Sequence, residues 1–321
     1  MALPPVDAAL PVARALAEVS RKQTPFYAAL GHLGFEPTFA GYRLQALERV
    51  RALGIYSGDT ELASTLSEGS LRISRGDWTG GLRALRRTEG SQLPFADRMT
   101  SARLAALGAW LGAVDTATAD SALQRVRALP GAEVAPPDRV ELRWLDGLLG
   151  VMRGDSARVQ RARQALAADT IDIARNAARS LTGLWLSRTE HDAGADTLRA
   201  SSEDAMRAGG AMTAVLAIDR LVVGRALRRR GSPAEAERYL MWPDGSTNIV
   251  RNTTVRFSIG GLVSYERGVA LEEAGDRRAA AYRLRRFVYA YDQPPPAHRA
   301  LVDDAKRRLA RLEQPDAPRT R

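Results

Sequence analysis

Histidines are considered first, because imidazole serves both as a metal ligand and as a general acid or base near neutral pH. The chain of 321 residues has three of them, His32, His191 and His298. They lie far apart, and no two have the i, i+4 spacing that places a pair of zinc ligands on one helix face. The spacing favours three separate histidines, with His191 solvated in a turn.

Motifs for other kinds of catalysis are missing from the sequence as well. It has no Gly-x-Ser-x-Gly elbow, no P-loop and no GxGxxG. The lack of cysteine excludes disulfides and thiolate-ligated metals. The adjacent Asp303 and Asp304 would project in different directions from a helix, so they do not form a carboxylate pair. We therefore expect a protein that is not an enzyme, with no catalytic residue, no metal site and no cofactor.

Charge is distributed unevenly along the chain. The net charge is +10, from 47 basic and 37 acidic residues. Residues 220–321 hold 21 basic and 12 acidic residues, a net charge of +9, which leaves +1 for the first 219. A solvated basic face explains this excess, and so does a surface for an anionic protein or a nucleic-acid backbone. The same third has few regularly interleaved aromatic residues, which argues against nucleic acid.

Small residues seven positions apart indicate the elements that would position any site. Six such pairs occur, at Gly69/Gly76, Gly108/Asp115, Gly147/Gly154, Ser187/Gly194, Gly224/Gly231 and Gly268/Gly275. The second member is usually followed by Asp or Ser, which joins a C-cap glycine to an N-cap acceptor for the next helix. Helical spacing of apolar residues flanks the turns. The sequence therefore predicts repeated units of helix, tight turn and antiparallel helix.

These units resemble the tetratricopeptide repeat. That family has a small residue seven positions before a Gly-Asp-type turn and favours Ala five positions after it. Gly224, Gly231 and Ala236 match this pattern, as do Gly268, Gly275 and Ala280. The segment 282–312 also resembles the close of helical-repeat arrays in large bacterial signalling proteins, including some serine/threonine kinases, although no kinase motif is present.

The resemblance implies an all-α fold, a right-handed superhelical solenoid of antiparallel helix pairs. We expect N-terminal helices over 1–58, with helical stretches at 6–22 and 38–53 that form a degenerate first unit. About six helix pairs follow over 59–292. A capping segment over 293–312 contains an amphipathic helix from 297 to 312, and 313–321 is a disordered tail.

In a tetratricopeptide array the first helix of each unit lines a concave groove. Positions ten, six and three residues before the turn then face inward. This register predicts five partner-binding residues: Trp144, Arg188, Arg225, Arg228 and Tyr265. Aromatic anchors beside guanidinium groups would hold an acidic peptide or a C-terminal carboxylate. The alternative is that Trp144 and Tyr265 only fill the core between repeats.

We therefore expect a non-enzymatic scaffold that binds a protein or peptide, in bacterial signalling or regulation. The alternative is a helical-repeat protein that binds nucleic acid through its basic C-terminal third. The N-terminal residues lack the pattern of a signal peptide, and no run is long and apolar enough for a membrane helix. The expected location is the cytoplasm, without membrane insertion, unless the chain belongs to a larger membrane-anchored protein.

Overall fold

The computed structural model describes residues 40–52, 58–129, 134–207, 213–241 and 253–314. Within these ranges the regular elements are helices and there is no strand. The all-α class is therefore confirmed for this part of the chain. Helix α3 (Ala40–Ala52) falls within the predicted stretch 38–53. The predicted helix at 6–22, His32 and residues 315–321 of the predicted tail lie outside the described residues.

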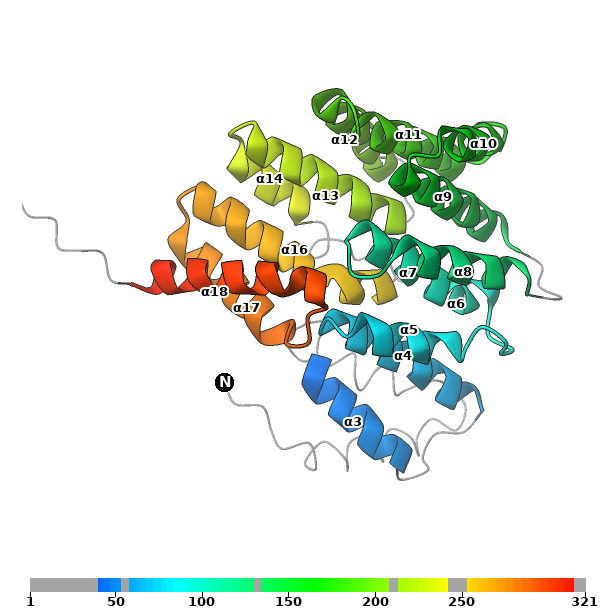
Figure 1. The fold of residues 1–321 in the computed structure, drawn as a ribbon, viewed down its shortest axis with the longest axis horizontal. Coiled ribbons are helices and arrows are strands. Elements are labelled where there is room, and N and C mark those ends of the chain that lie inside the picture. The colour runs from blue at the N-terminus through cyan, green and yellow to red at the C-terminus, as the bar shows by residue number, and fades with distance from the viewer. Residues whose placement is uncertain (1–39, 53–57, 130–133, 208–212, 242–252, 315–321) are drawn as a thin grey trace, which may run out of the picture.

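Antiparallel helix pairs follow α3 and make up most of the described chain (Figure 1). The pairs are α4 (Asp59–Ser74) with α5 (Trp78–Arg86), α7 (Thr100–Trp110) with α8 (Thr116–Arg127), α9 (Pro136–Arg153) with α10 (Ser156–Ala167), α11 (Asp172–Leu186) with α12 (His191–Arg207), α13 (Thr213–Arg229) with α14 (Pro233–Leu240), and α16 (Thr253–Glu273) with α17 (Arg277–Ala290). A short helix, α6 (Phe95–Arg98), precedes α7. Helices of each pair pack together, and each pair contacts the next one along the chain.

The turns between paired helices have the chemistry that the sequence predicts. Gly76 has φ of 94°, and its neighbour Asp77 donates its N–H to Arg72 O at 3.0 Å, which closes the end of α4. Asp77 then caps α5 by accepting the N–H of Gly80 at 2.8 Å. The turns at Gly154 and Gly275 repeat both features. The turn at Gly231 has the same backbone bonds, but Ser232 makes no side-chain cap.

The fourth pair differs from the prediction. Helix α11 ends at Leu186 and α12 begins at His191, so the turn lies at residues 187–190 and not at Gly194. Gly194 lies inside α12, where an added Cβ would come within 2.3 Å of Ser187 N and 2.7 Å of Gly183 O. Gly194 is therefore small because two helices approach closely there. The true upstream residue of this pair is Gly183, seven positions before Glu190.

The upstream glycines share one packing role. In four of the six pairs a Cβ added at the upstream glycine would overlap a leucine of the second helix within 2.9 Å, in the contacts Gly69–Leu85, Gly183–Leu198, Gly224–Leu240 and Gly268–Leu284. These leucines are fully buried. The glycines therefore let each second helix seat a leucine against the backbone of the first.

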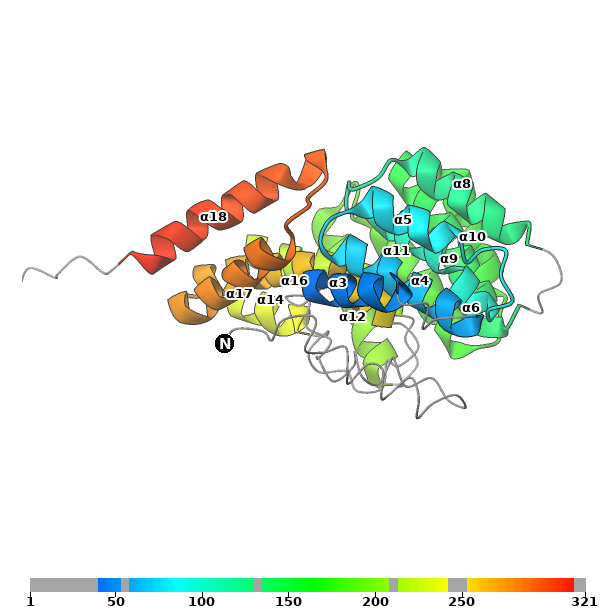
Figure 2. The same cartoon turned by 90° about the horizontal axis from the view of Figure 1, so that it is seen from below.

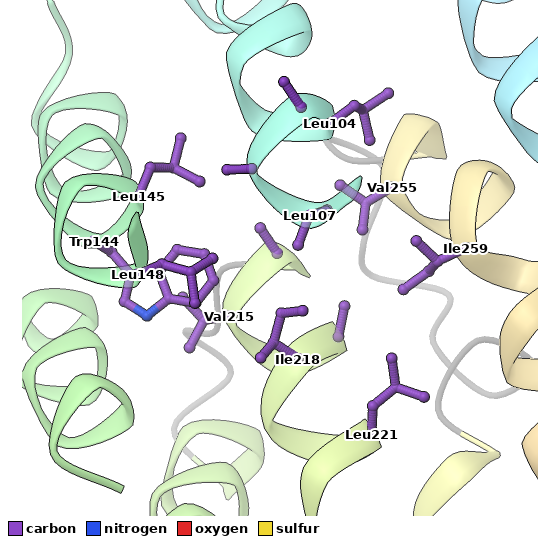
Figure 3. Packing of buried hydrophobic residues seen from close by; sticks show 14 of the residues in the cluster. Leu104, Leu107, Trp144, Leu145, Leu148, Val215, Ile218, Leu221, Val255 and Ile259 are labelled. Carbon is purple, nitrogen blue, oxygen red and sulfur yellow. The ribbon is translucent and has the colours of Figure 1, made fainter. Parts of the chain in front are cut away.

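The first helices of several pairs converge on a common core. Figure 3 shows side chains of α7, α9, α13 and α16 pointing toward one another, among them Leu107, Leu148, Ile218 and Ile259. Direct contacts of α7 with α13 and α16 agree with this view. In this part of the molecule the inner helix faces are therefore buried against each other.

The first and last pairs are also in contact, because α16 packs along α4 (Figure 1). The segment that follows α17 reinforces this contact. Gln293 donates its N–H to Arg75 O at 2.8 Å, and Arg75 Nε donates to Asp292 Oδ1 at 2.8 Å. The approach is so close that a Cβ at Gly76 would lie 2.7 Å from Gln293 O. The series of helix pairs thus closes on itself.

The chain then turns through a 3₁₀ helix, η3 (Pro296–His298), into α18 (Arg299–Glu313). The predicted helix at 297–312 corresponds to α18, which begins two residues later. Figure 2 shows α18 running beside α17 at one end of the molecule, and the two helices pack together. No helix in the described ranges combines the length and the apolar character that crossing a membrane requires.

Candidate interaction site

Arg225 and Arg228, two of the predicted partner-binding residues, lie together on α13 and face α16. Both bind Glu266: Arg225 Nε donates to its Oε1 at 2.7 Å, and Arg228 Nη1 donates to its Oε2 at 2.9 Å. Arg228 also holds Glu273 through bonds of 2.8 and 2.7 Å. Glu266 thus binds two arginines, and Arg228 binds two glutamates.

Burial separates the members of this cluster. The side chain of Glu266 is 6% exposed, that of Arg228 is 20% exposed and that of Arg225 is 42% exposed. A buried carboxylate needs a nearby cation, and the more buried Arg228 supplies it. The hydrogen bonds between Arg228 and Glu273 raise the pKa of the arginine and lower the pKa of the carboxyl. Arg225 is therefore the member most available to a ligand.

Tyr265, a third predicted residue, lies next to Glu266 on α16 and is half-buried. Its hydroxyl donates to Asp304 Oδ2 of α18 at 2.8 Å. Burial and this hydrogen bond raise the pKa of Tyr265 to about 12. Asp304 also accepts from Arg308 Nε at 2.6 Å, and Arg308 reaches back to Glu272 of α16 at 2.7 Å. Although burial opposes it, hydrogen bonds from Arg308 and Tyr265 lower the pKa of Asp304. Helix α18 thus borders the cluster on α13 and α16.

Trp144 does not reach the surface. It is fully buried in the shared core of Figure 3, and its indole Nε1 donates to Ser180 Oγ at 3.1 Å. The core alternative that the sequence left open therefore describes Trp144. The reason is geometric, since the inner faces of α7, α9, α13 and α16 meet and do not stand apart.

Arg188 lies apart from this cluster, in the turn between α11 and α12. The predicted register places Arg188 six residues before a turn at Gly194, but the turn lies at residues 187–190, so Arg188 does not occupy that inward-facing position. Its guanidinium lies 5.7 Å from the ring centroid of Trp185 and donates to Val151 O of the preceding pair. The structure thus brings together three of the five residues, Arg225, Arg228 and Tyr265.

A buried carboxylate that the sequence analysis missed lies behind Trp144. Asp219 of α13 is 1% exposed and accepts from Ser180 Oγ at 2.7 Å, which continues the chain from Trp144. Burial raises the pKa of Asp219 to about 8. It lines a cavity between α11, α12 and α13 with room for about one water molecule, beside Ser202, whose buried hydroxyl has no partner among the described residues. The sequence signal that could have indicated this buried carboxylate is an aspartate within the mostly apolar run 214–223.

A second buried polar chain links the ends of the helix series. Trp78 Nε1 donates to the Tyr291 hydroxyl at 2.9 Å. This hydroxyl lies 2.7 Å from His298 Nδ1, and His298 Nε2 lies 2.8 Å from Leu111 O. The arrangement fits a neutral imidazole that accepts at Nδ1 and donates at Nε2. Burial lowers the pKa of His298, which favours this neutral form. His298 is therefore structural.

Within the described residues, no group of three or more His, Asp or Glu side chains is arranged to hold a metal ion. Comparison of the chain with protein-family models, curated proteins and solved structures gave no match in any of the three.

Proposed function

We propose that this chain is a tetratricopeptide-like scaffold, a right-handed superhelix of antiparallel helix pairs that binds a protein or peptide without catalysing a reaction. The observation that carries the proposal is the succession of helix pairs, each packed on the next in chain order. Such arrays bury their apolar faces between neighbours and leave other helix faces for recognition. Because the inner faces of α7, α9, α13 and α16 meet (Figure 3), the proposed surface lies outside this shared core. The turn glycines and the fully buried Ala236 and Ala280 support the likeness to the family.

The docking surface is the cluster of Arg225, Arg228 and Tyr265, bordered by α18. A carboxylate of an acidic partner would bind Arg225, the most exposed member of the ion-pair cluster. Glu266 would remain paired with Arg228 when the partner binds Arg225, so this buried carboxylate would still have a cation. A charge-assisted hydrogen bond of this kind gives both affinity and direction to the contact.

The test is capture of partners on the intact chain from its native cell, after nuclease treatment, followed by mass spectrometry. Arg225→Gln should lower the affinity of the captured protein about tenfold or more, because a charge-assisted hydrogen bond is lost. Arg139→Gln on α9 is the matched control, since it removes the same charge from another exposed arginine. Equal binding by the wild type and Arg225→Gln would contradict this surface. Equal losses in both variants would show a non-specific charge effect.

Arg188→Gln extends the same experiment to Arg188, the predicted residue that is exposed but lies outside the cluster. Its position in the α11–α12 turn lets it contribute only if a partner also covers that turn. A loss of affinity in this variant would place Arg188 in the binding surface, and unchanged affinity would confine the surface to α13, α16 and α18.

A further inference from the structure

Helix α17 carries a strip of exposed side chains in which arginine and tyrosine alternate. The strip consists of Arg278, Tyr282, Arg285 and Tyr289, all exposed and spaced four, three and four residues apart, which puts them on one helix face. At 1.5 Å per residue it is about 16 Å long. The opposite face of α17, with Leu284 and Phe287, is fully buried in the core.

The two tyrosines are the most exposed large aromatic side chains of the described residues, at 53% for Tyr282 and 65% for Tyr289. Arginines flank the Tyr282 ring: the guanidinium carbons of Arg283 and Arg286 lie 5.8 and 5.2 Å from its centroid. Arg286 Nη1 also donates to the Tyr282 hydroxyl at 3.1 Å. This packing holds the ring in place on the surface by cation–π contacts.

Charge on this helix has a single sign. The sequence of α17 contains arginine at 277, 278, 283, 285 and 286 and no acidic residue. Arg285 has a carboxylate nearby, since its Nη2 donates to Glu313 Oε1 of α18 at 2.5 Å. Both side chains of that pair are largely exposed, at 62% and 46%, so the pair contributes little and an incoming anion can replace Glu313.

We propose that this strip binds single-stranded nucleic acid, a second binding function separate from the partner surface on α13 and α16. Arg278 and Arg285 would bind backbone phosphates, and Tyr282 and Tyr289 would stack on unpaired bases. The sparse aromatic residues of the C-terminal third argued against nucleic acid in the sequence. The fold changes that conclusion, because it places two of them on one exposed face, alternating with arginines.

Other anionic partners use only part of this surface. An acidic peptide would pair with the arginines, but its acidic side chains do not stack on the two exposed rings. An anionic membrane binds helices that present a broad apolar face, and the apolar face of α17 is already buried in the core. Duplex nucleic acid keeps its bases stacked inside the helix. Unpaired bases on a phosphate backbone match both the charge and the rings.

The experiment measures fluorescence anisotropy of a labelled twelve-nucleotide oligothymidylate with the full chain at low and moderate salt. Tyr282→Ala with Tyr289→Ala should weaken binding about tenfold or more, with little change in the salt dependence, because stacking is lost and charge is kept. Arg278→Glu should weaken binding and flatten the salt dependence, because a phosphate contact is lost. Arg139→Glu on α9 is the matched control and should be affected less.

Glu313→Gln is a variant that should gain affinity, a result that misfolding cannot produce. Removing this carboxylate frees Arg285, so affinity at low salt should rise by up to about fivefold. Absence of wild-type binding at low salt would overturn the proposal. So would full affinity in the double tyrosine variant, or equal binding of a duplex or of anionic phospholipid vesicles, because each would show that charge alone is responsible. Partner capture after nuclease treatment tests the α13–α16 surface independently.

Discussion

Asp219 is the residue whose chemistry departs most from its sequence context, because burial alone raises its pKa to about 8. At neutral pH this carboxyl is mainly protonated in the folded chain, while in the unfolded chain it is ionised above about pH 4. The folded state therefore binds more protons than the unfolded state between these two values. By linkage, stability must fall as pH rises through that window.

Asp219→Asn should remove that dependence. Asn keeps an acceptor for the Ser180 hydroxyl and carries no charge at any pH. We expect the free energy of unfolding of the wild type to contain a loss of up to about 1.4 kcal/mol per pH unit between pH 4 and 8, and this loss should vanish in the variant. Urea unfolding at several pH values measures it. Asp303→Asn, which changes an exposed carboxyl on α18, is the control. A slope shared by the wild type and Asp219→Asn would show that Asp219 is ionised in the folded chain.

At single positions, the sequence predicted which residues are neighbours better than it predicted which residues are buried. Arg225, Arg228 and Tyr265 lie close together because helical spacing puts both arginines on one face of α13, and α16 of the next pair packs against α13. Trp144 is buried because the inner helices meet, a property of how the pairs are arranged and not of its own unit. Whether an aromatic residue is buried depends on contacts from distant parts of the chain.

At the scale of elements, the turns were predictable wherever a glycine adopts positive φ before an aspartate cap. That chemistry is local, so Gly76, Gly154 and Gly275 mark their turns correctly. The fourth turn has no such glycine: Ser187 ends α11 in the right-handed region, and the nearby Gly194 serves helix packing. The sequence does not distinguish a glycine that forms a turn from a glycine that allows close helix packing. The predicted position of the fourth turn is therefore four residues too late.

Two turn glycines allow the cost of steric overlap to be separated from the cost of backbone conformation in a glycine-to-alanine substitution. Gly76 and Gly275 have φ of 94° and 87°, so alanine at either position costs about 1 kcal/mol or more in the left-handed region. A Cβ at Gly76 would also meet the backbone of Gln293 and Pro294 within 2.9 Å, whereas one at Gly275 meets nothing within 4 Å. Gly76→Ala should therefore lower the free energy of unfolding by about 1–3 kcal/mol more than Gly275→Ala. Chemical denaturation measures both, and equal losses would mean that residues 293–294 do not pack on this turn.

At the scale of the whole molecule, the closure of α16 on α4 was not predictable from the repeat. Contacts beside it also join residues more than 180 positions apart, such as Trp78 to Tyr291 and His298 to Leu111. A periodic sequence specifies how one pair packs on the next, but the number of pairs and the small rotation between them decide whether the ends meet. The linker with Asp292 and Gln293 then holds the ends together.

A distance across the junction between the first and last helix pairs tests most directly whether the series of pairs is closed. The chain has no cysteine, so Arg83→Cys on α5 and Tyr289→Cys on α17 provide two unique sites for spin labels on exposed positions of the first and last pairs. Pulsed electron paramagnetic resonance should give one narrow distance distribution in the otherwise wild-type chain, because α4 and α16 are packed together. A broad distribution at long distances would contradict closure and would describe an open array with separated ends.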